Sequence, residues 1–147
     1  MNPLLRTLLF DDHRLLRQSL VGLLESEGDI QVLGSLCATD AALGAARSSR
    51  PQVISVDIDM PGRVCFESAR DLEREEPEVH VLFLSVCFHD RCIEAALRCN
   101  ASGYLTKDQS GAELAETIRR TAEGLASFSE QAERGSCSAL ETSWRAA

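Results

Sequence analysis

Short apolar runs alternate with longer amphipathic segments along most of this chain. The apolar runs have the length of β-strands, and the longer segments repeat apolar residues at intervals of three or four, which is the period of an α-helix. This alternation predicts βαβ units and an α/β fold whose parallel sheet is covered on both faces. The five predicted strands cover residues 4–10, 30–36, 53–57, 79–85 and 103–106.

A helix is predicted after each of these strands. The five helices cover residues 14–27, 40–48, 65–76, 90–100 and 110–122. Gly28 is expected to end the first helix, and Ser110 with Glu113 has the spacing of a capping box at the start of the fifth. Residues 125–147 are rich in Ser, Glu and Ala and hold few large apolar residues, so we expect a partly ordered tail after a domain at 1–124.

Length and charge narrow the class of protein. The chain has 147 residues, 44% of them hydrophobic, which suits one globular domain with a sizeable core. Its 15 basic and 23 acidic side chains leave a formal charge of −8, which argues against direct nucleic-acid binding by this chain. No apolar run reaches membrane-spanning length and no signal peptide is evident, so we expect a cytoplasmic protein without membrane contact.

Cysteines are numerous but irregularly spaced. No CxxC pair occurs, and no pair of histidines has the spacing of zinc ligands. We therefore expect reduced thiols that pack as small apolar side chains. The six cysteines are Cys37, Cys65, Cys87, Cys92, Cys99 and Cys137.

Polar residues follow four of the predicted strands. Asp11 and Asp12 follow the first strand, Asp57 ends the third, Ser85 ends the fourth, and Lys107 follows the fifth. In a doubly wound sheet the ligand site lies outside the carboxyl ends of the strands, so these side chains are expected to converge. Three converging carboxylates repel one another and require a divalent cation, and Mg²⁺ suits oxygen ligands.

This set of groups suits phosphoryl transfer. A metal and a lysine beside Asp57 would neutralise an incoming phosphoryl group, Asp57 would be the nucleophile, and the Ser85 hydroxyl could donate to a transferred oxygen. The adjacent pairs Asp12-His13 and His89-Asp90 suggest a catalytic dyad. We expect their neighbouring side chains to diverge, and no Ser or Cys nucleophile is placed to use them.

Four sequence motifs contain these strand-end residues. They are Phe10-Asp11-Asp12-His13, Val56-Asp57-Ile58-Asp59-Met60-Pro61-Gly62, Val81-Leu82-Phe83-Leu84-Ser85 and Ala101-Ser102-Gly103-Tyr104-Leu105-Thr106-Lys107-Asp108. In order and spacing they resemble the motifs of bacterial response-regulator receiver domains of the NarL, FixJ and LuxR type, and the resemblance covers residues 4–124. It implies a CheY-like, flavodoxin-like α/β fold with five parallel strands in the order 2-1-3-4-5 and five helices.

The resemblance also implies a mechanism. Asp57 would be the phosphoacceptor for a sensor histidine kinase, and Asp11, Asp12, Asp57 and the backbone carbonyl of Asp59 would hold Mg²⁺. Such a protein is not an enzyme in the usual sense, although it assists its own phosphorylation and dephosphorylation.

The switch would follow from the new charge. Ser85 and Lys107 would contact the phosphoryl group, and Tyr104 would move inward as Ser85 is drawn toward it. The face of the fourth helix, fifth strand and fifth helix would then change its affinity for an effector domain or protein partner. Receivers of this type commonly pair, so a homodimer is also expected.

Three residues depart from the family pattern. Cys65 stands where another glycine is usual, Asp59 adds a fourth carboxylate, and Val86 is bulkier than the small residue often found after Ser85. Residues 125–147 are expected to be a tail or truncated linker without the helix-turn-helix domain common in NarL-like transcription regulators.

Two other functions compete with the phosphoacceptor. A pseudo-receiver would keep the fold and act as an interaction module without phosphorylation, and Cys65 and Asp59 favour it. A haloacid-dehalogenase-like phosphatase would use Asp57-Ile58-Asp59 as its Asp-x-Asp motif. In those phosphatases the Asp-x-Asp strand comes first and the acidic pair last, which is the reverse of the order here.

Overall fold

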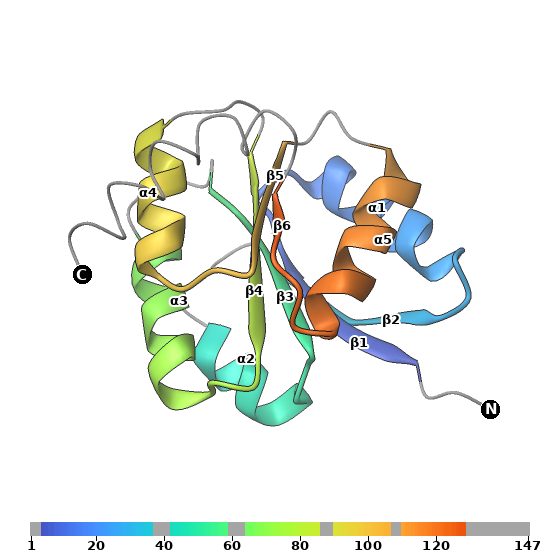
Figure 1. Cartoon of the computed structure of the whole chain (residues 1–147). Helices are drawn as coiled ribbons and strands as arrows, with labels where there is room; N and C mark the ends of the chain where they lie inside the picture. The colour runs from blue at the N-terminus through green and yellow to red at the C-terminus, as the bar shows by residue number, and fades with distance from the viewer. Residues whose placement is uncertain (1–3, 37–41, 59–63, 86–89, 107–109, 129–147) are drawn as a thin grey trace.

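Strands and helices alternate along the chain (Figure 1). The computed structural model describes residues 4–36, 42–58, 64–85, 90–106 and 110–128. The strands are β1 (Leu5–Phe10), β2 (Ile30–Leu36), β3 (Val53–Asp57), β4 (His80–Ser85), β5 (Gly103–Thr106) and β6 (Ser127–Phe128). The helices are α1 (Arg14–Glu25), α2 (Ala42–Ser49), α3 (Val64–Glu75), α4 (Asp90–Arg98) and α5 (Gly111–Ala122).

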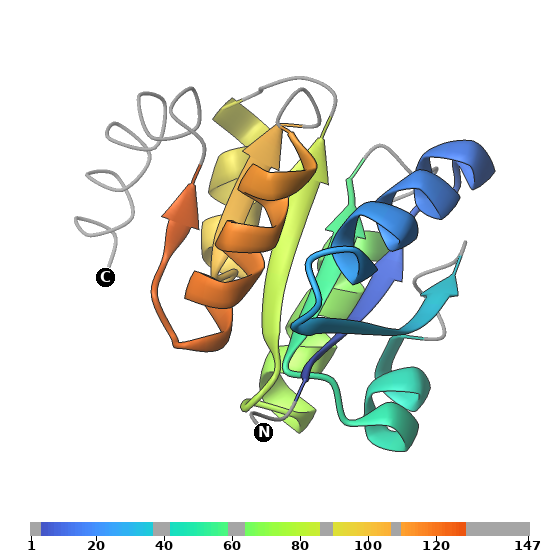
Figure 2. The ribbon, with the colours of Figure 1, turned by 90° about the vertical axis from the view of Figure 1, so that its right-hand side faces the viewer.

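The strands form one parallel sheet in the order β2-β1-β3-β4-β5-β6. The first five positions confirm the predicted order and the doubly wound α/β class. The sixth strand is an addition, because Ser127 and Phe128 pair with Gly103 and Tyr104 at the edge seen in Figure 2. The sheet therefore continues into the segment that composition alone assigned to a tail.

Helices cover both faces of the sheet. In Figures 1 and 2, α1 and α5 lie on one side and α2, α3 and α4 on the other. Strand β4 contributes to both cores, since Val81 and Phe83 join the cluster beneath the three helices while Leu82 and Leu84 join the other. Successive side chains of a strand point to opposite faces, so a strand buried on both faces is apolar throughout.

Local sequence signals end and begin helices as predicted. The Ser110 hydroxyl accepts a hydrogen bond of 3.2 Å from the backbone amide of Glu113, which confirms the N-terminal cap of α5. Gly28 follows the end of α1 with a φ of 88°, a left-handed conformation that glycine adopts without a steric penalty.

Two cysteine side chains are described, and neither is in a disulfide. Cys99, the residue after the end of α4, is buried in the core, and Cys92 on α4 packs against the same core. Burial raises the pKa of the Cys99 thiol, against an opposing effect of Arg70. These two residues confirm the expected packing role, whereas the side chains of Cys37, Cys65, Cys87 and Cys137 lie outside the described part.

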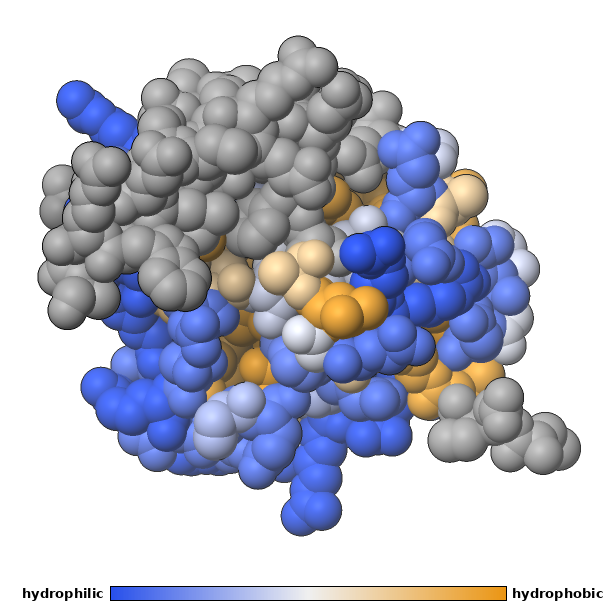
Figure 3. Space-filling view, in the orientation of Figure 1, coloured by the Kyte–Doolittle hydropathy of each residue, from blue (hydrophilic) through white to orange (hydrophobic). Residues whose placement is uncertain are grey.

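Among the described residues, the face drawn in Figure 3 is mainly polar, with apolar side chains in small separate areas. Large exposed apolar residues include Leu15, Leu23 and Leu125. Within the described segments, no helix combines the length and the apolar character needed to cross a bilayer.

Candidate phosphoacceptor site

Strand register brings the predicted acidic residues together. Phe10 of β1 pairs with Val56 of β3, so the next residues along the two strands, Asp11 and Asp57, emerge side by side at the carboxyl edge. Asp57 in turn pairs with Leu84 of β4, the residue before Ser85. The parallel sheet thus brings Asp11 and Ser85 to the same edge, although they are 74 positions apart in the sequence.

These residues differ in their exposure to solvent. Asp11 and Asp57 are completely buried, and Ser85 is 2% exposed. The Asp12 side chain is partly open, with 31% of its surface accessible. Two carboxylates are therefore removed from bulk water beside a third, an arrangement that is costly unless positive charge compensates it.

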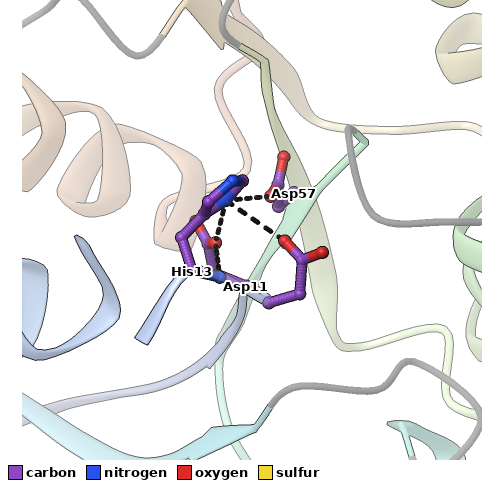
Figure 4. A group of neighbouring side chains, drawn as sticks. Asp11, His13 and Asp57 are labelled. Carbon is purple, nitrogen blue, oxygen red and sulfur yellow. Dashed lines mark hydrogen bonds and ion pairs between the residues drawn. The ribbon is translucent and has the colours of Figure 1, made fainter. Parts of the chain in front are cut away.

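A histidine ring lies against these carboxylates. His13 Nδ1 lies 3.2 Å from Asp11 Oδ1, 3.1 Å from Asp12 Oδ1 and 3.7 Å from Asp57 Oδ2. Figure 4 shows the imidazole ring reaching over Asp11 toward Asp57. The prediction that the Asp12 and His13 side chains diverge is therefore wrong, because the turn after β1 directs both toward Asp57.

The turn that carries His13 is held by two hydrogen bonds. The backbone amide of His13 donates to Asp11 Oδ1 at 2.8 Å, which is an Asx-turn two residues long. The Arg17 guanidinium on α1 donates to the backbone carbonyl of Asp11 at 2.7 Å. Sequence reasoning assigned neither His13 nor Arg17 to the site, although an aspartate two positions before a helix-starting histidine is a signal for such a turn.

Tyr104 lies inside the core. Its side chain is fully buried within the cluster that includes Phe83 and Ile93. The structure therefore describes one buried position of the ring. Its inward movement on phosphorylation stays a prediction.

Several predicted site features lie outside the described residues. Asp59, Val86 and Lys107 belong to segments that the structure leaves undescribed, as does the side chain of Cys65. The backbone carbonyl of Asp59 and the ammonium of Lys107 therefore stay predictions.

The described donor set suits a divalent metal ion. One oxygen each from Asp11, Asp12 and Asp57 and one nitrogen of His13 all lie within 4.8 Å of one another. Carboxylate oxygens are the ligands that Mg²⁺ prefers, and a small number of them with retained water is its usual protein environment. The residues present therefore fit the predicted metal.

Comparison with known proteins agrees with this geometry. The family profile of the response regulator receiver domain matches residues 7–119, which is most of the chain. The chain therefore belongs to the receiver-domain family of two-component response regulators.

Relatives of this chain are response regulators. Response regulator GacA of Pseudomonas viridiflava is 34% identical over 116 residues, which cover 79% of this chain and 54% of GacA. The DNA-binding transcriptional activator DevR/DosR of Mycobacterium tuberculosis is 31% identical over 121 residues, covering 82% of this chain and 56% of that protein. This chain thus spans about half the length of these relatives.

A solved receiver domain shares the fold. The signal receiver domain of the response regulator NarL from Mycobacterium tuberculosis superposes with a TM-score of 0.79 at 28% identity, covering 84% of this chain and 99% of that domain. Family membership favours a signalling receiver over the phosphatase alternative, in agreement with the chain order of the acidic residues. Receiver domains of this class interact with histidine kinases and with effector domains.

Proposed function

We propose that this receiver accepts a phosphoryl group on Asp57 from a sensor histidine kinase in a Mg²⁺-dependent reaction. The observation that carries the proposal is the position of Asp57, fully buried at the carboxyl end of β3 beside Asp11. The carboxylate oxygen of Asp57 forms the new bond to phosphorus as the bond to the kinase imidazole breaks, and the imidazole leaves with a proton. The product is an acyl phosphate.

Mg²⁺ held by Asp11, Asp12 and Asp57 would supply positive charge to the phosphoryl oxygens. The backbone carbonyl of Asp59 is the further proposed ligand. Burial of Asp11 and Asp57 limits competition from water and strengthens the electrostatic interactions within the site.

Ser85 and Lys107 are the proposed sensors of the phosphoryl group. Ser85 follows the residue that pairs with Asp57, so its hydroxyl is on the neighbouring strand at the same edge of the sheet. A hydroxyl and an ammonium that bind the new oxygens form charge-assisted hydrogen bonds, which are stronger than neutral ones. Their role is to favour the signalling state once the charge arrives.

The output surface is proposed to be the face of α4, β5 and α5. Ser85 pairs with Thr106 at the end of β5, which links the site to that face through the sheet. A change from about 1% to about 99% signalling state requires roughly 5.5 kcal/mol of differential stabilisation. A metal and two charge-assisted hydrogen bonds are of this order. The recipient is an effector domain or a separate protein.

Intact-mass spectrometry after incubation with acetyl phosphate and Mg²⁺ tests this function. We expect one added phosphoryl group on the unmodified protein and none on Asp57→Asn or after prior chelation of Mg²⁺. Asp71→Asn is the matched control, because Asp71 is an exposed carboxylate on α3 that pairs with Arg74. Labelled Asp57→Asn would contradict the acceptor assignment, and an unlabelled protein that binds Mg²⁺ would favour the pseudo-receiver.

A further inference from the structure

His13 occupies a ligand position within the acidic cluster. Its Nδ1 atom is 3.1 to 3.7 Å from one oxygen of each of the three aspartates. Figure 4 shows the ring placed across Asp11 with Nδ1 on the side of Asp57. The imidazole therefore faces the carboxylates, although 58% of the His13 side chain is accessible to solvent.

The separations between these atoms match those of ligands that share one ion. Zinc-type ions lie about 2.0–2.2 Å from nitrogen and oxygen ligands, and two such ligands are about 3.0 Å apart at a right angle and about 3.5 Å apart at a tetrahedral angle. The distances of 3.1 to 3.7 Å from Nδ1 to the three carboxylate oxygens are of this size. All four candidate ligand atoms lie within 4.8 Å of one another, against a limit of about 4.2 Å for ligands on opposite sides of one ion, so an ion can contact them with at most small side-chain shifts.

The imidazole nitrogen of His13 changes which metal ion is preferred at a site whose other ligands are carboxylate oxygens. Mg²⁺ takes oxygen ligands and retains water, whereas imidazole suits transition ions such as Co²⁺, Ni²⁺ and Zn²⁺. We propose that His13 is a metal ligand and gives this site a preference for divalent transition ions over Mg²⁺. The inference rests on the metal site of the proposed function and adds the identity of the ion that the site selects.

The turn presents His13 in advance of metal binding. Its backbone amide is held by Asp11 Oδ1 at 2.8 Å, and Arg17 fixes the Asp11 carbonyl at 2.7 Å. The same Asp11 oxygen thus orients both the backbone and the ring of His13. A ligand held in place before the ion arrives loses less conformational entropy on binding, which favours affinity.

Calorimetric titration of the whole chain with Co²⁺ and separately with Mg²⁺ tests the inference. We expect His13→Ala to lower the ratio of Co²⁺ to Mg²⁺ affinity by about tenfold or more. Loss of a residue that only supports a metal ligand already lowers metal affinity about 10- to 100-fold. His13→Asn serves as a second variant that keeps a polar side chain. The visible spectrum of bound Co²⁺ should change in both variants, because it reports the loss of a nitrogen ligand.

His80→Ala is the matched control. His80 begins β4, at the opposite end of that strand from Ser85, and its ring contacts the Ser102 hydroxyl at 3.1 Å. This variant should keep both the affinity ratio and the Co²⁺ spectrum of the unmodified protein. If the affinity ratio fell as much in His80→Ala as in His13→Ala, Co²⁺ would be binding histidines nonspecifically, and this result would overturn the inference.

An unchanged affinity ratio and an unchanged Co²⁺ spectrum in His13→Ala would also overturn it, since the imidazole would then be a hydrogen-bond partner of the carboxylates and not a metal ligand. The outcome is separable from that of the proposed function. Labelling of Asp57 with Mg²⁺, together with no effect of His13→Ala on Co²⁺, would reject the ligand and keep the phosphoacceptor. If His13→Ala lowered the preference for Co²⁺ but Asp57 of the unmodified protein never accepted a phosphoryl group, the metal ligand would be kept and the phosphoacceptor rejected.

Discussion

The backbone amide of Ile58 donates a hydrogen bond of 2.9 Å to the carbonyl oxygen of Leu84. Ile58 follows Asp57, and Leu84 precedes Ser85. This bond extends the pairing of β3 with β4 by one step beyond Asp57. It fixes the relative position of the proposed acceptor and the proposed sensor through the main chain, without dependence on the side chains of either.

Replacement of Ser85 by alanine should slow labelling of Asp57. A hydrogen bond to a charged group contributes about 1.5–3 kcal/mol, so its loss near the transferred group corresponds to roughly a tenfold or greater fall in rate. The time course of phosphoryl addition by intact-mass spectrometry measures this. Ser48→Ala on α2, whose hydroxyl donates to the backbone of Gly44, is the control and should keep the rate. A rate within twofold for Ser85→Ala would remove Ser85 from the mechanism.

Metal binding should stabilise the fold. A ligand that binds the native state alone adds about 2.7 kcal/mol to the free energy of unfolding at a concentration of 100 times its dissociation constant. Urea denaturation with and without saturating Mg²⁺ measures this gain.

Asp57→Asn should reduce the increase in the free energy of unfolding that Mg²⁺ causes. It should also raise the free energy of unfolding of the metal-free protein. It removes one of two fully buried carboxylates, Asp11 and Asp57, that repel each other. Asp71→Asn, on the surface of α3, should do neither. Lower stability of metal-free Asp57→Asn would contradict the repulsion argument.

Arg119 and Asp29 should make stability depend on pH. The Arg119 guanidinium on α5 donates to both oxygens of Asp29, at 2.7 and 2.9 Å, and this contact holds the pKa of Asp29 below its ordinary value of 3.8. The folded pKa lies below the unfolded one, so the contribution is present above the unfolded pKa and lost as the pH falls through the folded pKa.

Arg119→Gln should therefore lower the free energy of unfolding by about 0.5–1 kcal/mol at pH 7, a range suited to a solvent-exposed bidentate pair. The difference from the unmodified protein should shrink below about pH 4, where Asp29 becomes protonated in the unfolded chain. Urea denaturation across this pH range tests both points. Arg74→Gln, which removes an exposed pair within α3, should have a smaller effect, and a difference independent of pH would contradict the role of Asp29.

Tyr104 should be important for stability whatever its part in signalling. Its side chain is fully buried, so Tyr104→Ala leaves a large cavity and should cost about 3–5 kcal/mol in the free energy of unfolding. Tyr104→Phe keeps the ring and should cost much less. Because Tyr104 is the single tyrosine of the chain, second-derivative absorption reports its exposure directly. Increased burial after treatment with acetyl phosphate would contradict the buried starting position.

Much of the architecture could be predicted because strands buried on both faces require continuous apolar sequence. Residues 79–85 illustrate this, since their apolar run predicts a central strand and β4 covers His80–Ser85. The capping signal at Ser110 also depends on neighbours along the chain alone. Strand β6 could not be predicted in this way, because two residues are too short to show a period and their pairing depends on an open sheet edge.

The sequence by itself determined which chemical groups stand at the ends of the strands, and therefore that Asp11, Asp57 and Ser85 meet at one edge. That inference needs only the rule that parallel strands share a carboxyl edge. Tertiary structure alone decided the direction of the His13 ring and the burial of Tyr104. Side-chain direction depends on turn geometry and on packing between distant segments, and neither is encoded in the spacing of residues along the chain.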